Sequence, residues 1–391
     1  MKERMYCDII WQQRKCWKQW TTAASRCLVR VVTFSLCFVV AFVLSSCRSD
    51  DVTPATDEEK ERPISFNAAV SVSMETRAAG DGELTNAALQ ASGFGVYCWY
   101  TGTSAFNNNP SAAIDMLMRN QKVTYDATLS DPAWTYTPPK YWPKNQAELL
   151  TFRAYAPYVS YNLPTDNNGM PQLPVIVGDD DYHNGTQHDP VWGTGKFADS
   201  ELFGALYNDV TYTNNGVIDW YFHHGMAKLI FKGQMVDDGS DMTVNITSIT
   251  LTPLYNQGLL DISSPATSET DEPVWNDRDG ALTVTILGDD LDQKAINQLE
   301  MTQLTSDERG LLIIPHEYST MAPLTLTVTY ETEDGREVTM SAPITQDFKG
   351  NTVYTFHMTV SNSLTVVIEA VNAAFTPWVI LPSGSGEIYN W

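Results

Sequence analysis

Cys47 is the residue whose type and position point most directly to covalent chemistry. It follows an apolar run, residues 31–44, which is preceded by arginines and is too short for a comfortable membrane span. Ser45 and Ser46, between the run and the thiol, are small enough to fit a signal peptidase. Because only a thiol accepts a diacylglycerol there, the pattern predicts a signal peptide over residues 1–46, cleavage between Ser46 and Cys47, and lipidation of Cys47.

The peptide bond between Arg77 and Ala78 is the second reactive position. The basic side chain is followed by a soft Ala-Ala-Gly-Asp-Gly run, so a trypsin-like protease with specificity for arginine could cut there. The residues before it alternate in the manner of a half-buried strand, with these apolar side chains on one face: Ile64, Phe66, Ala68, Val70 and Val72. The sequence thus predicts a first strand, residues 64–77, that proteolysis makes removable.

The free energy gained by burying the apolar side chains of that strand decides what its removal would do. Burial of each large apolar side chain contributes roughly 1.5 to 3 kcal/mol, and the sum rivals the roughly 5 to 15 kcal/mol that keeps a domain folded. An empty groove would be hard to sustain, so a strand from a second subunit would fill it by β-strand addition. Neither half of the pattern is rare, so on the pattern alone an ordinary first strand followed by an ordinary loop arginine is the favoured interpretation.

Carboxylates and imidazoles gather in one acidic segment, which is the best candidate for a metal site. Carboxylate oxygens suit calcium and added imidazoles suit zinc. The segment lacks the regular ligand spacing of a calcium loop, so we favour a solvated acidic loop and expect no metal or other cofactor. Its residues are Asp179, Asp180, Asp181, His183, His188 and Asp189.

Other groups capable of chemistry point away from catalysis. His223 and His224 are neighbours in a predicted strand, so they face opposite ways and cannot share a metal; we expect one to be packed and the other exposed. Residues 192–196 contain Gly-Thr-Gly-Lys without the spacing or the strand-to-helix context of a phosphate loop. We therefore predict no enzymatic activity.

Aromatic residues are frequent in the first half of the chain. They could line a glycan-binding surface by stacking, but such residues more often fill the core and edges of sandwiches, and we favour that interpretation. The residues concerned are Tyr97, Trp99, Tyr100, Phe106, Trp134, Tyr136, Tyr141 and Trp142.

Composition restricts the partners. The 391 residues include 24 Lys and Arg against 47 Asp and Glu, a formal net charge of −23, which argues against nucleic acid as a partner. After loss of the signal peptide only Cys47 and Cys98 remain, so neither a disulfide framework nor a Cys-based metal site is available. We expect Cys98 to be a small buried hydrophobe.

The elements that position these residues are predicted to be mostly strands. An acidic tether over residues 47–63 precedes two domains, 64–220 and 221–391, with a turn-rich excursion over 161–219 and a tail over 372–391. Short helices are expected over 84–91 and 289–303, and one strand over 219–231. Strands without intervening helices favour an all-β fold of antiparallel sandwiches.

Several short segments, in a particular order and spacing, carry a family resemblance. They are residues 120–125 (NQKVTY), 134–138 (WTYTP), 141–143 (YWP), 150–157 (LTFRAYAP), 189–193 (DPVWG), 224–231 (HGMAKLIF) and 246–251 (ITSITL). Together they resemble the fimbrillin family, the type V pilins of Bacteroidetes. Arg153 and Gly225 depart from the family pattern, because an apolar or aromatic residue and a bulkier residue are expected there.

The resemblance implies a fold and a way of assembly. It implies two tandem transthyretin-like β-sandwich domains in a structural and adhesive fimbrial subunit, held at the outer membrane and cell surface by its acyl chains. An Arg-specific protease would cut after Arg77, and the C-terminal segment of another pilin subunit would replace the departed strand, in a homo- or hetero-polymer. Candidate anchors of that donor tail are Trp378, Ile380, Ile388 and Trp391. A host or bacterial surface ligand is a further expected partner.

Two other functions remain open. A surface glycan-binding lipoprotein serving nutrient uptake would keep acylated Cys47, whereas a pilin subunit would start at Ala78. An enzyme, metal-dependent through residues 179–189, is the third hypothesis.

Overall fold

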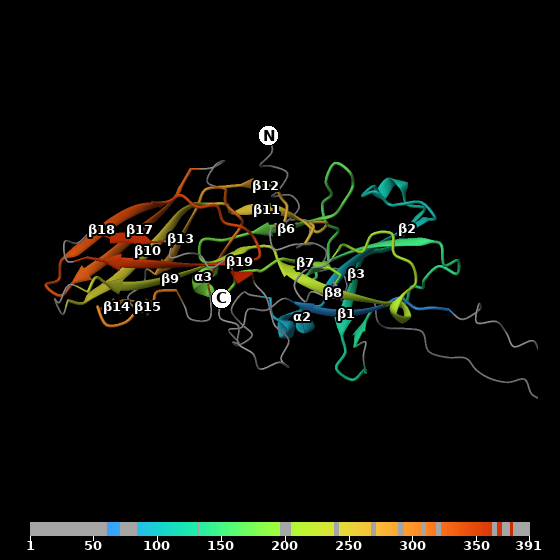
Figure 1. The fold of residues 1–391 in the computed structure, drawn as a ribbon, viewed down its shortest axis with the longest axis horizontal. Helices are drawn as coiled ribbons and strands as arrows, with labels where there is room; N and C mark the ends of the chain where they lie inside the picture. The colour runs from blue at the N-terminus through green and yellow to red at the C-terminus, as the bar shows by residue number, and fades with distance from the viewer. Residues whose placement is uncertain are drawn as a thin grey trace, which may run out of the picture. The chain divides into compact units, whose positions relative to one another are not determined.

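The described part of the chain is built almost entirely of strands. The computed structural model describes residues 61–70, 84–130, 133–195, 205–237, 242–266, 271–287, 293–305, 310–317, 322–361, 366–369 and 376–377. The prediction of an all-β fold is confirmed (Figure 1). In this part of the chain no helix has the length and apolar character needed to cross a membrane.

Seven strands from the first half close on themselves as a barrel. Their interior is filled by one hydrophobic cluster that includes Phe66, Phe94 and Phe222. Helix α2 (Asn86–Ser92), which Thr85 caps through a hydrogen bond from the backbone of Ala88, packs against this barrel. In barrel order the strands are β1 (Ser65–Val70), β4 (Trp134–Thr135), β3 (Asp115–Tyr125), β2 (Phe94–Gly102), β5 (Leu149–Ala156), β7 (Val191–Thr194) and β8 (Val217–His224).

The second half forms two sheets that enclose another core. Strict alternation of buried and less buried residues along β9 and β19 directs one face of each strand into this core. The first sheet contains β13 (Leu282–Leu287), β10 (Val244–Leu254), β17 (Leu324–Thr332) and β18 (Glu337–Ile344), with β14 (Lys294–Ile296) also paired to β10. The second contains β15 (Thr302–Gln303), β9 (Ala227–Met235), β19 (Thr352–Val360) and β20 (Val366–Glu369), with β16 (Leu311–Ile313) on β9 and β21 (Thr376–Pro377) on β19.

A third, small sheet joins strands that lie far apart in sequence. Its order is β12 (Trp275–Asp279), β11 (Gln257–Asp261) and β6 (Gln172–Ile176). The side chains between this sheet and the outer face of β2 form a third hydrophobic cluster, which contains Trp99, Trp192 and Leu260. The excursion expected over 161–219 is therefore only partly loop, because β6, the short helix α3 (Asp181–Asn184) and β7 all lie within it.

Among the described strands two pairs are parallel, which an entirely antiparallel arrangement would not contain. In the barrel, β1 runs parallel to β8 from Ser65↔Val217 to Val70↔Phe222. In the second half, β9 runs parallel to β19 from Ala227↔Thr352 to Met235↔Val360. In both halves, then, an early strand is joined to a late one.

The chain passes from the barrel to the second half at Gly225. The single strand expected over 219–231 is wrong, because β8 and β9 belong to different sheets and are separated at Gly225-Met226. A side chain at Gly225 would meet Leu260 and the carbonyl oxygen of Pro190, each at 2.8 Å, which explains the small residue there. The predicted division at residue 220 falls inside β8, and the division into two domains stays a prediction.

The helix expected over 289–303 is also wrong for the described residues. Residues 294–296 pair with β10 as β14, and residues 302–303 pair with β9 as β15. Ile296 is buried in the core while Leu299 is exposed, so the apparent helical spacing does not mark one buried face. Pairing with the edges of the two sheets has overridden the local preference of these residues for a helix.

Arg153, the second departure from the family pattern, is a buried connector. Its side chain is fully buried and donates to Ser263 Oγ at 2.9 Å, to Asn208 Oδ1 at 2.7 Å, to Asn108 Oδ1 at 3.0 Å and to the carbonyl of Phe152 at 2.8 Å. Burial lowers the pKa of this guanidinium to about 10, and the nearby carboxylates of Asp261 and then Asp209 oppose that shift. The arginine thus connects β5 of the barrel to the turn after β11.

Substitution of this connector is expected to destabilise the protein. Arg153→Met leaves three side-chain acceptors without their donor, so we expect the free energy of unfolding to fall by about 2–4 kcal/mol. Exposed Arg336, whose backbone groups form hydrogen bonds with Thr332 in a turn, is the matched control. Arg336→Met should change the free energy of unfolding by less than about 0.5 kcal/mol. Equal effects of the two substitutions in urea unfolding would contradict a connecting role.

Candidate functional site: the groove of the first strand

Strand β1 is held along its length by one neighbour. Its backbone pairs with β8 over residues 65–70, but with β4 only at Phe66↔Trp134. The edge of β1 that faces β4 is therefore mostly free of ladder pairing among the described residues. An incoming strand that replaced β1 would find the continuous ladder of β8 ready to receive it.

The side chains of β1 fill the barrel interior as the alternation predicted. Ile64, Phe66 and Val70 are 2%, 0% and 0% exposed, and partly buried Ala68 packs against the same cluster. The ring of Phe66 lies 5.4 Å from that of Tyr136 and 6.1 Å from that of Phe94, measured between centroids. By area, these three large side chains contribute roughly 5 to 9 kcal/mol as an upper estimate.

The N-terminal end of β1 is anchored by Arg62. Its guanidinium donates to the carbonyl oxygens of Pro143 at 2.7 Å and Lys144 at 2.9 Å, and lies 4.7 Å from the ring centroid of Tyr212. Its own carbonyl accepts from the backbone of Trp142 at 2.8 Å. Sequence reasoning assigned Arg62 to the tether and missed this role, because no local pattern reveals a partner eighty residues away.

The C-terminal end of β1 is anchored by residues that follow the predicted cleavage site. The backbone N–H of Val70 donates to Asn86 Oδ1 at 2.9 Å, and that of Leu84 donates to the buried carboxylate of Asp189 at 3.1 Å. The chain therefore leaves and re-enters the described structure close to one place, at the start of α2. The intervening residues 71–83, with Val72, Arg77 and Ala78, lie outside the described residues.

Polar side chains of β1 also contact β8. Asn67 donates through Nδ2 to Asp219 Oδ1 at 3.0 Å, and Asn214 holds the other oxygen of the same carboxylate at 2.8 Å. This contact fixes the register of β1 on β8, since a slip of one residue would move Asn67 to the opposite face.

Other predicted site residues lie outside the described residues. They are the lipidation and signal-cleavage residues Ser46 and Cys47 and the donor-tail anchors Trp378, Ile380, Ile388 and Trp391. The backbone just before the tail anchors is described: Thr376-Pro377 forms β21, which pairs antiparallel with Thr352-Val353 of β19.

The acidic segment is divided between solvent and core. Asp179 and Asp180 are exposed, and Asp181 accepts from the backbone of Gly178 at 2.6 Å and from Thr186 Oγ1 at 2.8 Å. Asp189 is instead buried, where it contacts His224 Nδ1. No three such side chains gather as metal ligands among the described residues, which do not include the side chain of His183.

Both histidines of β8 are buried, so the expectation that one is exposed is wrong. Strand β8 has the barrel interior on one side and the third cluster on the other, which leaves neither face to solvent. His223 Nε2 lies 2.8 Å from Thr194 Oγ1. Burial, and next the neighbouring His224, lower the pKa of His223 to about 3.

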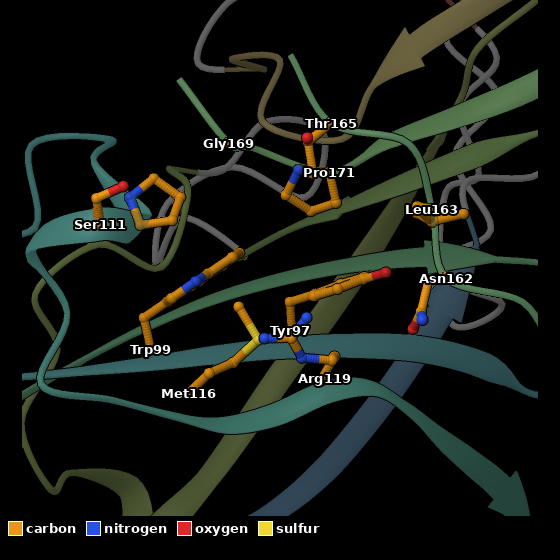
Figure 2. A pocket seen from close by; sticks show the side chains of 11 residues that line it. Tyr97, Trp99, Ser111, Met116, Arg119, Asn162, Leu163, Thr165, Gly169 and Pro171 are labelled. Carbon is orange, nitrogen blue, oxygen red and sulfur yellow. The ribbon is translucent and has the colours of Figure 1, made fainter. Parts of the chain in front are cut away.

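Most of the aromatic residues belong to the core, which is the interpretation that the sequence analysis favoured. Trp99, Phe106, Trp134 and Trp142 are buried, and Tyr141 is 41% exposed. Cys98 is a free, buried thiol, as predicted. Tyr97 and Trp99 also contribute to the wall of a cavity of about 270 Å³ on the outer face of β2 (Figure 2).

The fold and the groove define a β-rich protein whose first strand completes a barrel by pairing with the barrel's last strand. A model of the fimbrillin-like family matches residues 76–378. The chain therefore belongs to the fimbrillin-like family.

Individual relatives are distant. The chain is 24% identical over 238 residues to the fimbrium subunit Fim1C of Phocaeicola vulgatus, covering 58% of this chain and 59% of the relative, so it spans about three fifths of that relative's length. Similar solved structures include a fimbrial protein from Bacteroides vulgatus, with 19% identity, 79% and 98% coverage of this chain and that one, and a TM-score of 0.43. A cell adhesion protein from Parabacteroides distasonis has 8% identity, 79% and 96% coverage and a TM-score of 0.45.

Removal of the Phe66 ring is expected to weaken the first strand strongly. Phe66→Ala opens a cavity at a fully buried position, so the free energy of unfolding should fall by about 3–5 kcal/mol. Exposed Ala69, on the same strand, is the control, and Ala69→Ser should change the free energy of unfolding by less than about 0.5 kcal/mol. A small effect of Phe66→Ala in urea unfolding would show that β1 contributes little to the barrel.

Acid is expected to destabilise the barrel through His223. The unfolded state takes up a proton near the ordinary pKa of 6.5 and the folded state only near 3, so this contribution is complete above pH 6.5 and is lost as the pH falls toward 3. Its slope is at most about 1.4 kcal/mol per pH unit. His223→Gln should reduce the slope of the unfolding free energy between pH 6 and 4, measured by urea unfolding at each pH, and an unchanged slope would contradict this assignment.

Proposed function

We propose that this protein is a structural and adhesive subunit of a cell-surface fimbria, which polymerises when its first strand is exchanged for a strand of another subunit. Membership of the fimbrillin-like family supports a fimbrial role at the cell surface together with other pilin subunits. The observation that carries the proposal is β1 itself, a strand whose apolar face is buried, which pairs along its length with β8 and is linked to the body through residues 71–83.

The proposed sequence of events begins with export as a lipoprotein. Lipidation of Cys47 after removal of residues 1–46 anchors the precursor to the outer membrane through its acyl chains. An Arg-specific protease then cuts between Arg77 and Ala78, within the segment whose two ends meet at Asn86. After the cut, β1 is retained only by its pairing, its buried side chains and the Arg62 anchor.

Exchange then replaces those contacts with equivalent ones. The donor is a C-terminal segment of a neighbouring subunit, with Trp378, Ile380, Ile388 and Trp391 as the proposed anchors in this chain. Because the apolar burial of β1 is comparable with the stability of a whole domain, the cut protein keeps β1 until a donor displaces it. Cutting and release are thus separate steps.

A surface glycan-binding lipoprotein is the second candidate, and the cavity beside Tyr97 favours it. The two functions differ at the N-terminus of the protein extracted from cells. A chain that starts at Ala78 indicates a fimbrial subunit, whereas a chain that starts at acylated Cys47 indicates the glycan-binding lipoprotein or an anchor.

The assembly proposal is tested by cutting the purified precursor with an Arg-specific protease. We expect a ladder on gels and filaments by electron microscopy for the wild type, and an uncut monomer for Arg77→Ala. Arg77→Lys is the matched control, because it should resist the Arg-specific protease and regain assembly with a Lys-specific one. A cut wild type that stays monomeric, or an uncut variant that polymerises, would overturn strand exchange triggered at this bond.

A further inference from the structure

The cavity on the outer face of β2 lies away from the groove of β1. Tyr97 and Trp99 of β2 lie beside Met116 and Arg119 of β3, under the segment that carries Thr165, Gly169 and Pro171 (Figure 2). Its volume of about 270 Å³ is below the range of about 300–1,000 Å³ common for drug-sized ligands, so it suits a single small ring.

The charge of the cavity contrasts with that of the chain. Acidic residues outnumber basic ones by 47 to 24 in the sequence, yet the residues that line the cavity include Arg119 and no Asp or Glu. Arg119 is exposed, and among the described residues it has neither a hydrogen-bond nor an ion-pair partner. Its guanidinium is therefore available to a ligand carboxylate, which it can bind through two parallel hydrogen bonds.

A carboxylate in the segment over the cavity is engaged in backbone hydrogen bonds. Asp166 accepts hydrogen bonds from the backbone of Asn168 at 2.9 Å and of Met170 at 2.8 Å. These bonds hold the turn that contains Gly169, which adopts a left-handed φ of 87°. Asp166 thus shapes the rim instead of neutralising Arg119.

The remaining lining matches the two kinds of surface that a sugar ring presents. Tyr97 and Met116 offer apolar surface for the C–H face of a ring, and Ser111, Asn162 and Thr165 offer polar groups for its hydroxyls. The indole of Trp99 is stacked on Tyr97 at 5.9 Å between centroids and supports this wall from the buried side.

We propose that this cavity binds one acidic sugar unit, a pyranose that bears a carboxylate, with Arg119 pairing to that carboxylate. The inference deepens the proposed adhesive function by naming the class of ligand. It does not depend on cleavage or strand exchange, because β2 directs Phe94, Val96 and Cys98 into the barrel and Tyr97 and Trp99 to the other side.

The test uses the uncut precursor and titration calorimetry with D-glucuronate and D-galacturonate, each compared with its neutral parent hexose. We expect one uronate to bind at least tenfold more tightly than its neutral parent. Arg119→Gln should lower the uronate affinity at least tenfold and leave any affinity for the neutral hexose unchanged. Lys122→Gln, which removes the same charge from the same strand outside the cavity lining, should leave the uronate affinity within twofold.

Two results would overturn the assignment. One is that the folded wild-type precursor binds neither uronate at millimolar concentration. The other is that a uronate binds but Arg119→Gln and Lys122→Gln weaken it equally, since that pattern reports general charge attraction. Because the precursor is uncut, neither result affects the assembly test, and failure to form filaments would leave this binding result intact.

Discussion

The burial of β1 against β8 is the contact on which the barrel depends. Phe66 reaches Phe94 and Tyr136, so one strand of six residues contacts side chains from β2 and from the chain beyond β4. Its backbone, however, is paired fully on one side only. A strand that contributes much to the core through its side chains but little to the ladder on one edge is costly to lose and accessible to replacement. Both properties are needed for strand exchange to be specific and effectively one-way.

The same connectivity recurs in the second half with a different consequence. There β9 and β19 form the parallel pair, and β19 is bounded on its other side by β20 and β21. Parallel pairing of early and late strands requires the whole intervening chain to return, so these contacts are non-local, which is typical of slowly folding topologies. In the first half the early strand pairs along its length with β8 alone and with β4 at one position, whereas in the second half β9 continues directly from β8 through Gly225. Of these two early strands, β1 is therefore the one whose replacement would leave the other pairings of its sheet in place.

Local patterns in the sequence predicted local features well. The alternation over residues 64–70 identified the buried face of β1, and the apolar surroundings of Cys98 identified a core thiol. Predictions failed where the deciding partner was distant. Residues 294–296 pair with β10 and residues 302–303 with β9, which no local spacing reveals. Both faces of β8 are likewise covered by segments from elsewhere in the chain. The anchors Arg62 and Asn86 were missed for the same reason, since a side chain that bonds to a remote backbone group leaves no periodic signal.

The period of a strand also explains how one sheet can support two functions. Successive side chains of β2 point to opposite faces. Phe94, Val96 and Cys98 belong to the core that β1 completes, whereas Tyr97 and Trp99 belong to the cluster under β6 and β11 and border the cavity. The proposed exchange of β1 would change the neighbours of the first set and leave those of the second in place. A fibre built in this way would keep its cavity in every subunit, so that many weak sites along one polymer could act together by avidity.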